Sequence, residues 1–375
     1  MKSLGLYFHI PFCPYRCHYC DFLSFANHEH MIPEYVSCLI RDLKFFLPDF
    51  RDYEIKTIFF GGGTPSLLRA EQIERILSAV YSYCHTAAEI EVTLESNPGT
   101  ITLEKLSGYQ AAGVNRLSFG VQALQNRHLK RMGRIHTAEE AQEGFKLARK
   151  AGFQNLNIDL IFGLPDQSLE EWEESLNQVV QWEPEHLSTY GLQIEEGTPF
   201  FTDYRQGIFS LPGEEIEALM YEKTIKRLRT RGYEQYEISN FSKPGYECRH
   251  NLIYWNNEEY LGIGLGAFSY LSKKRFWMTR NMAKYLKGEE KISGWEVLPL
   301  EKEVGETMML GLRLKKGISN VRFFGRFGKR LQEFYSHLIS KYEPSGLLKW
   351  EDDALHLTES GFMIANHVIQ EFLLD

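Results

Sequence analysis

The chain has 375 residues, a length typical of about two domains. Hydrophobic residues make up 43% of it and aromatic residues 14%, which is enough to fill a sizeable core. The net charge of −8 leaves no surplus of Lys and Arg to neutralise phosphates, so we expect no nucleic-acid partner.

Three further features bear on location. The sequence has no run of 18 apolar residues, which predicts no membrane span and at most peripheral membrane contact. The first predicted strand begins almost at residue 3, which leaves no room for a signal or transit peptide. Six cysteines are too sparse for a disulfide-stapled secreted protein. We therefore expect a cytoplasmic protein with reduced thiols.

Three cysteines follow the first predicted strand, residues 4–10, in the pattern C-x3-C-x2-C: Cys13, Cys17 and Cys20. Three thiolates are one ligand short of a closed zinc site or a fully ligated iron–sulfur cluster. On a four-iron cube they would leave one iron open for another ligand. The alternative is a zinc site with His9 or His18 as fourth ligand, although structural zinc usually pairs C-x2-C with a second, distant pair.

From residue 3 to about 195, strand patterns alternate with helical patterns. Strands are predicted at 4–10, 57–60, 89–95, 116–121, 155–162 and 186–194. Helices are predicted at 33–47, 70–83, 103–112, 138–151 and 169–182. Six β/α units in a row predict an α/β fold with a parallel sheet, and six strands are too few to close as an eight-stranded barrel does. We therefore expect a partial (β/α)6 barrel with an open mouth.

Glycines and polar side chains follow the predicted strands. Gly61–Gly63 follow the second strand, Glu95 ends the third, Gln122 ends the fourth and Asp159 lies in the fifth, with Arg134 shortly after the fourth. Carboxyl ends of parallel strands meet at one face, where such folds bind ligands. Taken singly, the glycines could form a bare turn and each polar residue a cap or an ion pair. As a set they fit a ligand with hydroxyl, amino and carboxylate groups.

The rest of the chain predicts a helix at 211–231, an edge strand at 232–240 and a segment that contains His250 and continues to Trp255 as HNLIYW. Helices at 301–312, 319–327 and 331–342 precede a hairpin at 346–351 and 354–357, and Thr358 caps a last helix, 358–372. Helices followed by a hairpin predict a mostly helical, winged-helix-like C-terminal domain. The expected domains are 1–240 (barrel), 241–295 (connecting segment) and 296–375.

Five runs carry a family resemblance: GVNRLSFGVQ at 113–122, GRIH at 133–136, NIDLIFGLP at 157–165, YEISNF at 236–241 and HNLIYW at 250–255. With the cysteine loop, they resemble the radical S-adenosylmethionine (radical SAM) superfamily. Within it they resemble the oxygen-independent coproporphyrinogen III oxidase-like family. The resemblance covers nearly the whole chain and is nearest to the haem chaperone branch.

The resemblance implies that Cys13, Cys17 and Cys20 hold a [4Fe-4S] cluster whose open iron binds S-adenosylmethionine (SAM). It implies a SAM pocket lined by Tyr7, Tyr19, Gly62, Gly63, Thr64, Glu95, Gln122, Arg134 and Asp159. In the chaperone branch the HNxxYW motif is linked to haem, and imidazole is a common axial ligand of haem iron. From residue type alone, a structural role for His250 is favoured over haem ligation.

Two departures separate the chain from the oxidases of this family. Phe22 stands where the oxidases carry a fourth cysteine, and their amino-terminal extension has no counterpart here. The resemblance therefore favours a haem chaperone whose partners are haem, haem-accepting apo-proteins and an electron donor such as flavodoxin or ferredoxin. The alternatives are coproporphyrinogen III oxidase and another radical SAM enzyme, such as a methyltransferase. No acid/base pair marks a defined substrate, so no catalytic residue is predicted. The weak basic charge of the C-terminal domain favours packing or haem covering over nucleic-acid binding.

Overall fold

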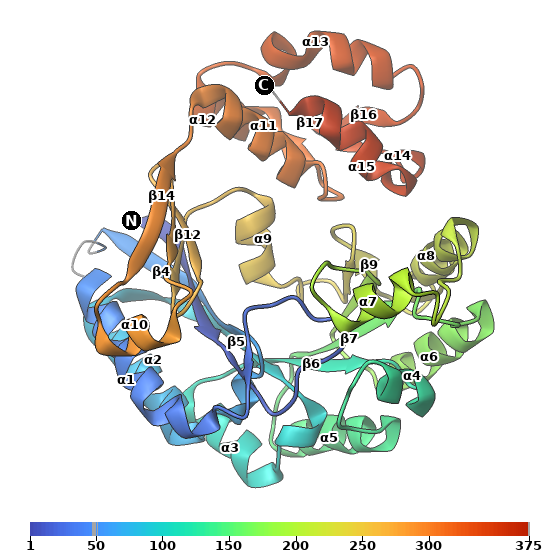
Figure 1. Cartoon of the computed structure of the whole chain (residues 1–375). Coiled ribbons are helices and arrows are strands. Elements are labelled where there is room, and N and C mark those ends of the chain that lie inside the picture. The colour runs from blue at the N-terminus through green and yellow to red at the C-terminus, as the bar shows by residue number, and fades with distance from the viewer. Residues whose placement is uncertain (47–49, 51, 374–375) are drawn as a thin grey trace.

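The computed structural model describes residues 1–46, 50 and 52–373 (Figure 1). Residue 47, the predicted end of the first helix, lies outside the described residues. Within them the chain forms a 12-stranded sheet, a three-stranded sheet in the C-terminal part, a two-stranded pair, and helices that surround the sheets.

Six parallel strands stand side by side in chain order at the centre of the large sheet. They are β1 (Lys2–Ile10), β4 (Tyr53–Gly62), β5 (His85–Ser96), β6 (Arg116–Gln122), β7 (Leu156–Phe162) and β8 (His186–Gly191). The helices between them are α1 (Ile32–Phe46), α2 (Ala70–Tyr83), α3 (Leu103–Ala112), α4 (Asn126–Arg131), α5 (Ala138–Lys150) and α6 (Leu169–Gln181). The helices cover the outer face of the curved sheet (Figure 1). The predicted partial (β/α)6 barrel is confirmed.

The first strand shows how the sequence builds two different faces. Leu4, Leu6 and Phe8 are fully buried in the core shared with α1 and α2. Gly5 and Tyr7 alternate with them, so they point to the other, inner face of the sheet. Since the inner face carries small and polar side chains on several strands, it can line a cavity instead of closing it.

The sheet continues at both ends beyond the six β/α units. On one side β11 (Tyr260–Ile263) pairs parallel with β1 and is followed by antiparallel β12 (Phe268–Leu271), β13 (Lys274–Met278) and β14 (Ile292–Val297). On the other side lie β10 (Asn240–Ser242) and β9 (Glu234–Gln235). The segment expected to connect two domains thus supplies strands to the barrel sheet.

Short elements complete this part of the chain. They are β2 (Phe12–Cys13), β3 (Phe25–Ala26), α7 (Pro199–Arg205), α8 (Glu214–Arg229), α9 (Arg249–Trp255) and α10 (Met282–Lys287). Helix α9 contains the whole HNLIYW run and lies at the centre of the molecule, between the barrel and the C-terminal helices (Figure 1).

The C-terminal part has its own hydrophobic core. The elements of the C-terminal part are α11 (Leu300–Gly311), β15 (Ile318–Ser319), α12 (Asn320–Phe327), α13 (Leu331–Tyr342), β16 (Leu348–Glu351), β17 (Ala354–Leu357), α14 (Glu359–Met363) and α15 (Ala365–Ile369). The predicted hairpin is β16–β17, and the Thr358 side chain accepts from the Gly361 N–H as a cap. The predicted last helix is instead two short helices, because Ile364 leaves helical geometry with φ −124° and ψ 33°.

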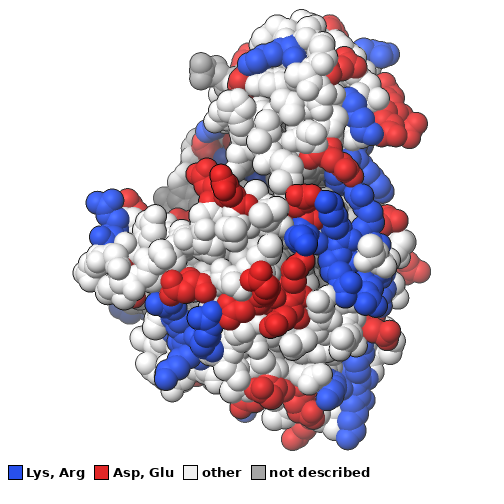
Figure 2. Space-filling model, turned by 90° about the vertical axis from the view of Figure 1, so that its right-hand side faces the viewer, with Lys and Arg blue, Asp and Glu red and all other residues white. Residues whose placement is uncertain are grey.

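Two general features of the chain complete the description. No helix among the described residues combines the length and the apolar character needed to cross a membrane. The face drawn in Figure 2 carries Asp and Glu beside Lys and Arg. Arg229 of α8, for example, pairs with Glu359 of α14 at 2.7 Å, which joins the barrel to the C-terminal part.

Candidate functional site

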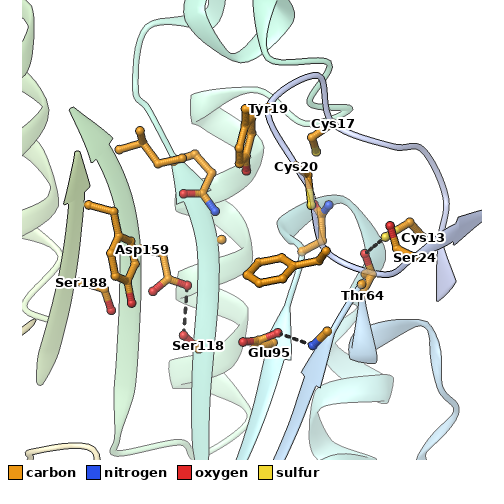
Figure 3. A pocket seen from close by; sticks show the side chains of 18 of the residues that line it. Cys13, Cys17, Tyr19, Cys20, Ser24, Thr64, Glu95, Ser118, Asp159 and Ser188 are labelled. Carbon is orange, nitrogen blue, oxygen red and sulfur yellow. Dashed lines mark hydrogen bonds between the residues drawn. The ribbon is translucent and has the colours of Figure 1, made fainter. Parts of the chain in front are cut away.

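A cavity of about 440 Å³ opens at the carboxyl ends of β4–β8, beneath the cysteine loop (Figure 3). It collects residues from distant parts of the chain. Eleven of the thirteen predicted site residues line it: Cys13, Cys17, Tyr19, Cys20, Gly62, Gly63, Thr64, Glu95, Gln122, Arg134 and Asp159. The structure therefore brings most of the residues singled out in the sequence together at one cavity.

The cysteine loop is fixed over this cavity by backbone hydrogen bonds at several points. The His18 N–H donates to the Met132 carbonyl at 2.9 Å, and the Phe200 N–H donates to the His18 carbonyl at 3.0 Å. The Phe25 N–H donates to the Pro11 carbonyl at 2.7 Å. The first two bonds tie the loop to the end of α4 and to α7, and the third closes the base of the loop.

The thiols lie in a polar, partly buried setting (Figure 3). The Thr64 hydroxyl donates to Cys13 Sγ at 3.5 Å, and Arg134 Nη1 donates to Cys17 Sγ at 3.6 Å. Burial raises the pKa of Cys13 and raises that of Cys20 to about 11. Burial therefore favours the neutral thiol at Cys13 and Cys20, and a bound cation would favour their thiolates.

The two histidines considered as a fourth zinc ligand have other partners. His9 uses one ring nitrogen for the Tyr7 hydroxyl (3.0 Å) and the other for the Leu23 carbonyl (2.8 Å). His18 Nδ1 lies 2.8 Å from the Arg131 carbonyl. Among the described residues, no three His, Cys, Asp or Glu side chains converge as ligands of one metal ion. Both ring nitrogens of His9 and Nδ1 of His18 therefore already have partners within the protein.

Two half-buried carboxyl groups line the cavity as well. Glu95 accepts from the Gly62 N–H at 3.0 Å, and burial followed by the charge of Asp159 raises its pKa to about 8. Asp159 accepts from the Ser118 hydroxyl (3.0 Å) and from Asn157 Nδ2 (2.7 Å), and burial raises its pKa as well. A ligand with positive charge would restore the ionised form of both groups.

Arg134 and Gln122 form a further wall. The Arg134 guanidinium donates to the Gly120 carbonyl as well as to Cys17, so it is held between β6 and the cysteine loop. Gln122 ends β6 with a positive φ of 70°, which turns the chain at the edge of the cavity. Arg134 contacts a thiol and lines the cavity, so its guanidinium is a candidate partner for a ligand carboxylate.

Other cavity residues were not predicted, above all Arg116, Ser118, Asn157 and Ser188. Arg116 is 2% exposed, and no described residue forms an ion pair or side-chain hydrogen bond with its guanidinium. Its position follows from strand alternation, since residues 116, 118, 120 and 122 share the inner face of β6. That signal was present in the sequence.

Tyr7 and His250 do not line this cavity. Tyr7 lies on the opposite side of the cysteine loop, with its hydroxyl on His9. His250 is fully buried, and its ring nitrogens bond with the Thr57 hydroxyl at 2.7 Å and the Tyr254 hydroxyl at 2.9 Å. In this conformation its imidazole therefore meets neither the cavity nor solvent.

Comparisons with known proteins agree with the motifs. Residues 7–179 match the model of the radical SAM superfamily, and residues 298–364 match that of the HemN C-terminal domain. The second match coincides with the C-terminal helices and hairpin, so both parts of the chain have a counterpart.

Similar full-length proteins carry the name heme chaperone HemW. The chain is 38% identical to the protein from Lactococcus lactis, covering 100% of this chain and 98% of the relative. It is 37% identical to that of Bacillus subtilis and 38% identical to that of Escherichia coli, covering 99% of each. These matches leave no large part of the chain or of the relatives unaligned.

Among solved structures, coproporphyrinogen III oxidase (HemN) from Escherichia coli superposes with a TM-score of 0.85 at 22% identity. The match covers 99% of this chain and 90% of that one. At this identity the likeness is one of fold.

Proposed function

Because the chain belongs to the HemW family of radical SAM proteins, we propose that it is a haem chaperone that binds haem and delivers it to acceptor proteins. The observation that carries this proposal is full-length similarity to proteins named heme chaperone. Phe22 supports it, because it takes the place of the cysteine that the oxidases carry after the third cluster ligand.

The cavity residues fit the two cofactors that the family implies. Cys13, Cys17 and Cys20 would hold a [4Fe-4S] cluster, with Thr64 and Arg134 donating to its sulfur ligands. Such a cluster supplies one-electron reduction of the SAM sulfonium. On the protein side, Glu95 and Asp159 would hold the hydroxyl and ammonium groups of SAM, and Arg134 its carboxylate.

The proposal gives the HNxxYW motif a role in haem binding. His250 would act through Tyr254, whose hydroxyl it bonds and whose ring reaches a surface groove. Direct coordination of iron by His250 would require the loss of its bond to Thr57 or Tyr254.

Two further expectations complete the proposal. A flavodoxin or ferredoxin would supply the electron to the cluster. The cytoplasm would be the site of action, since thiols stay reduced there and all six cysteines are free in the structure.

The test is a set of anaerobic measurements on the full chain with a reconstituted cluster. We expect haem to remain bound through gel filtration and to pass to an apo-haem-protein when the two are mixed. We expect no vinyl product from coproporphyrinogen III. Absence of haem binding, or formation of the vinyl product, would contradict the proposal.

The cluster assignment has a matched pair of variants. Cys17→Ser should lose most of the iron, the sulfide and the brown absorbance. Cys84→Ser should keep them, because Cys84 is a half-buried cysteine outside the cavity. Equal iron and sulfide contents in the two variants would refute the three-thiolate site.

A further inference from the structure

A second cavity, here called the aromatic groove, lies on the other side of the cysteine loop and measures about 390 Å³. One wall is the end of the cysteine loop, Asp21–Leu23, and the other is the turn between β11 and β12 with Phe268. Tyr7, His9, Tyr254, Tyr260 and Arg280 complete the lining. Phe22 and Asp21 line both this groove and the cluster cavity, so the two spaces adjoin.

Contacts between the cysteine loop and its neighbours fix the width of the groove. Leu23 receives a hydrogen bond on its carbonyl from the His9 ring at 2.8 Å. A Cβ on Gly266, which has φ +69°, would lie 2.5 Å from Leu23 Cδ2, so the turn packs tightly on the loop. The groove is therefore a preformed feature of the fold and not a gap between mobile loops.

Aromatic side chains border this groove without covering one another. Phe22 is 63% exposed and Phe268 is 48% exposed, which is unusual for phenylalanine. Tyr254 and Tyr260 form the inner part, edge to face with their ring centroids 4.6 Å apart. Such a lining suits a flat, conjugated ligand, because ring faces stack on one another and shed water.

Arg280 supplies a positive charge at the groove. Its side chain is exposed, and no carboxylate among the described residues lies within ion-pair distance of it. Asp21 also lines the groove, from the cysteine-loop wall. A guanidinium beside an apolar slot is complementary to a carboxylate carried on a flat apolar body.

We propose that the aromatic groove is the haem seat, with Phe22 and Phe268 against the ring, Arg280 on a propionate and Tyr254 in the inner wall. This inference rests on the proposed function and names the place at which it occurs. His250 is a positioning residue, since it bonds the Tyr254 hydroxyl from below and does not line the groove. Haem in this seat would lie beside the cluster cavity and leave it free, so haem and SAM bind together.

The test is a haem titration of the full chain with reconstituted cluster. Phe268→Ala and Arg280→Gln should each raise the haem Kd about tenfold, through loss of one stacking contact and of one charge-assisted hydrogen bond. Both side chains are exposed, so the variants should keep the fold, the iron content and SAM affinity. Saturating SAM should leave the haem Kd of the wild type unchanged.

Matched controls are Phe324→Ala and Arg205→Gln, which remove an exposed phenylalanine and an exposed arginine elsewhere. Both should bind haem as the wild type does. If the wild type binds haem and the groove variants bind it equally well, or if SAM displaces haem, the groove is not the seat, while the chaperone function stands. If the wild type binds no haem, the proposed function itself fails.

Discussion

His250 illustrates how a motif residue can matter without touching a ligand. Its imidazole is fully buried, packs face to face on Phe59 with centroids 5.1 Å apart, and bonds two hydroxyls. Burial lowers its pKa to about 3, so the ring is neutral and structural near neutral pH. Loss of the ring would leave a cavity and would remove the partner of the buried Thr57 hydroxyl and of the half-buried Tyr254 hydroxyl.

We therefore predict that His250→Ala lowers the free energy of unfolding by about 2–4 kcal/mol. Denaturant unfolding followed by circular dichroism would measure this. The exposed His337→Ala is the control and should stay within about 0.5 kcal/mol of the wild type. A His250→Ala variant as stable as the wild type would show that the ring is not a packing element. Any loss of haem in this variant has to be weighed against its stability.

Glu95 gives a prediction about pH. Its pKa of about 8 lies above the unfolded value of 4.5, because burial disfavours the carboxylate. Its contribution to fold stability is therefore complete below pH 4.5 and is lost as the pH rises through 8. A cationic ligand has the opposite preference, since it binds the carboxylate.

SAM affinity should therefore rise with pH, by up to about tenfold per unit below pH 8, and binding should release a proton. Calorimetry of the cluster-loaded protein in buffers of different ionisation enthalpy measures that release. Glu95→Gln should bind more weakly and with a smaller proton release; the remainder would come from Asp159, whose pKa is also raised. A pH-independent affinity in the wild type would contradict this role.

Eleven residues that line the cavity were predicted from the sequence, but the side chains that contact them were not. The cysteines, Glu95 and Asp159 were found because strand ends and motif positions are visible in the sequence. Arg116 was missed although its inward position follows from alternation, since a charged residue inside a strand is usually interpreted as solvent-facing. The environment of His250 depends on Thr57, 193 positions away along the chain, which no local pattern reveals.

At the scale of elements, the close contact between the end of β4 and the start of the cysteine loop determines the position of Cys13. A Cβ on Gly63 would lie 2.7 Å from the Phe12 carbonyl oxygen and 2.8 Å from Cys13 Sγ. Backbone cannot yield as a flexible side chain can, so the added methyl group must displace β2 and Cys13.

Gly63→Ala should therefore keep the fold but lose most of the cluster. Iron and sulfide analysis after reconstitution, together with circular dichroism, checks both statements. Gly325→Ala in α12 is the control: its Cβ meets nothing within 4 Å, so it should retain the cluster and gain about 0.5–1 kcal/mol of stability. Full cluster content in Gly63→Ala would show that the loop adapts to the methyl group.

The six β/α units were predictable because each strand and helix has a strong local pattern, as in α5 with its Thr137–Glu140 capping box. The pairing of β11 with β1 was not, since it joins residues 5–8 to residues 260–263. The break at Ile364 was also missed, because apolar periodicity continues through it. The positions of short strands and helix kinks depend on tertiary contacts, which the local periodicity of the sequence does not reveal.

At the scale of the whole molecule, the C-terminal part is fastened to the barrel sheet. The backbone of Lys315 donates to the Tyr236 carbonyl at 2.9 Å, and Glu237 forms a bridge with Leu314. A second fastening centres on Arg326 of α12. These contacts hold α11 and α12 close to α9 and β12. Since α9 and β12 also border the aromatic groove, the C-terminal part packs directly behind that groove.

Arg326 offers a sharp test of that link. Its guanidinium donates to buried Glu303 at 2.8 Å, to the Asn257 carbonyl at 2.6 Å and to the Tyr270 hydroxyl at 2.8 Å. The alanine variant would leave the Glu303 carboxylate buried with only Lys273, 3.5 Å away and largely exposed, as counter-charge. Since a buried charge without its close partner is costly, Arg326→Ala should lower the free energy of unfolding by about 2–4 kcal/mol.

Arg322→Ala is the matched control, because Arg322 lies one turn away and pairs with Glu258 at the surface, with its side chain 59% exposed. It should change the free energy of unfolding by less than about 1 kcal/mol. Denaturant unfolding of both variants decides the matter. If they are equally stable, Arg326 is not needed to hold the C-terminal part, which then depends on the contacts of Tyr236 and Glu237 with Leu314 and Lys315 for its attachment. If only Arg326→Ala is weakened, one side chain of α12 joins the sheet, α9 and α11 into a single body.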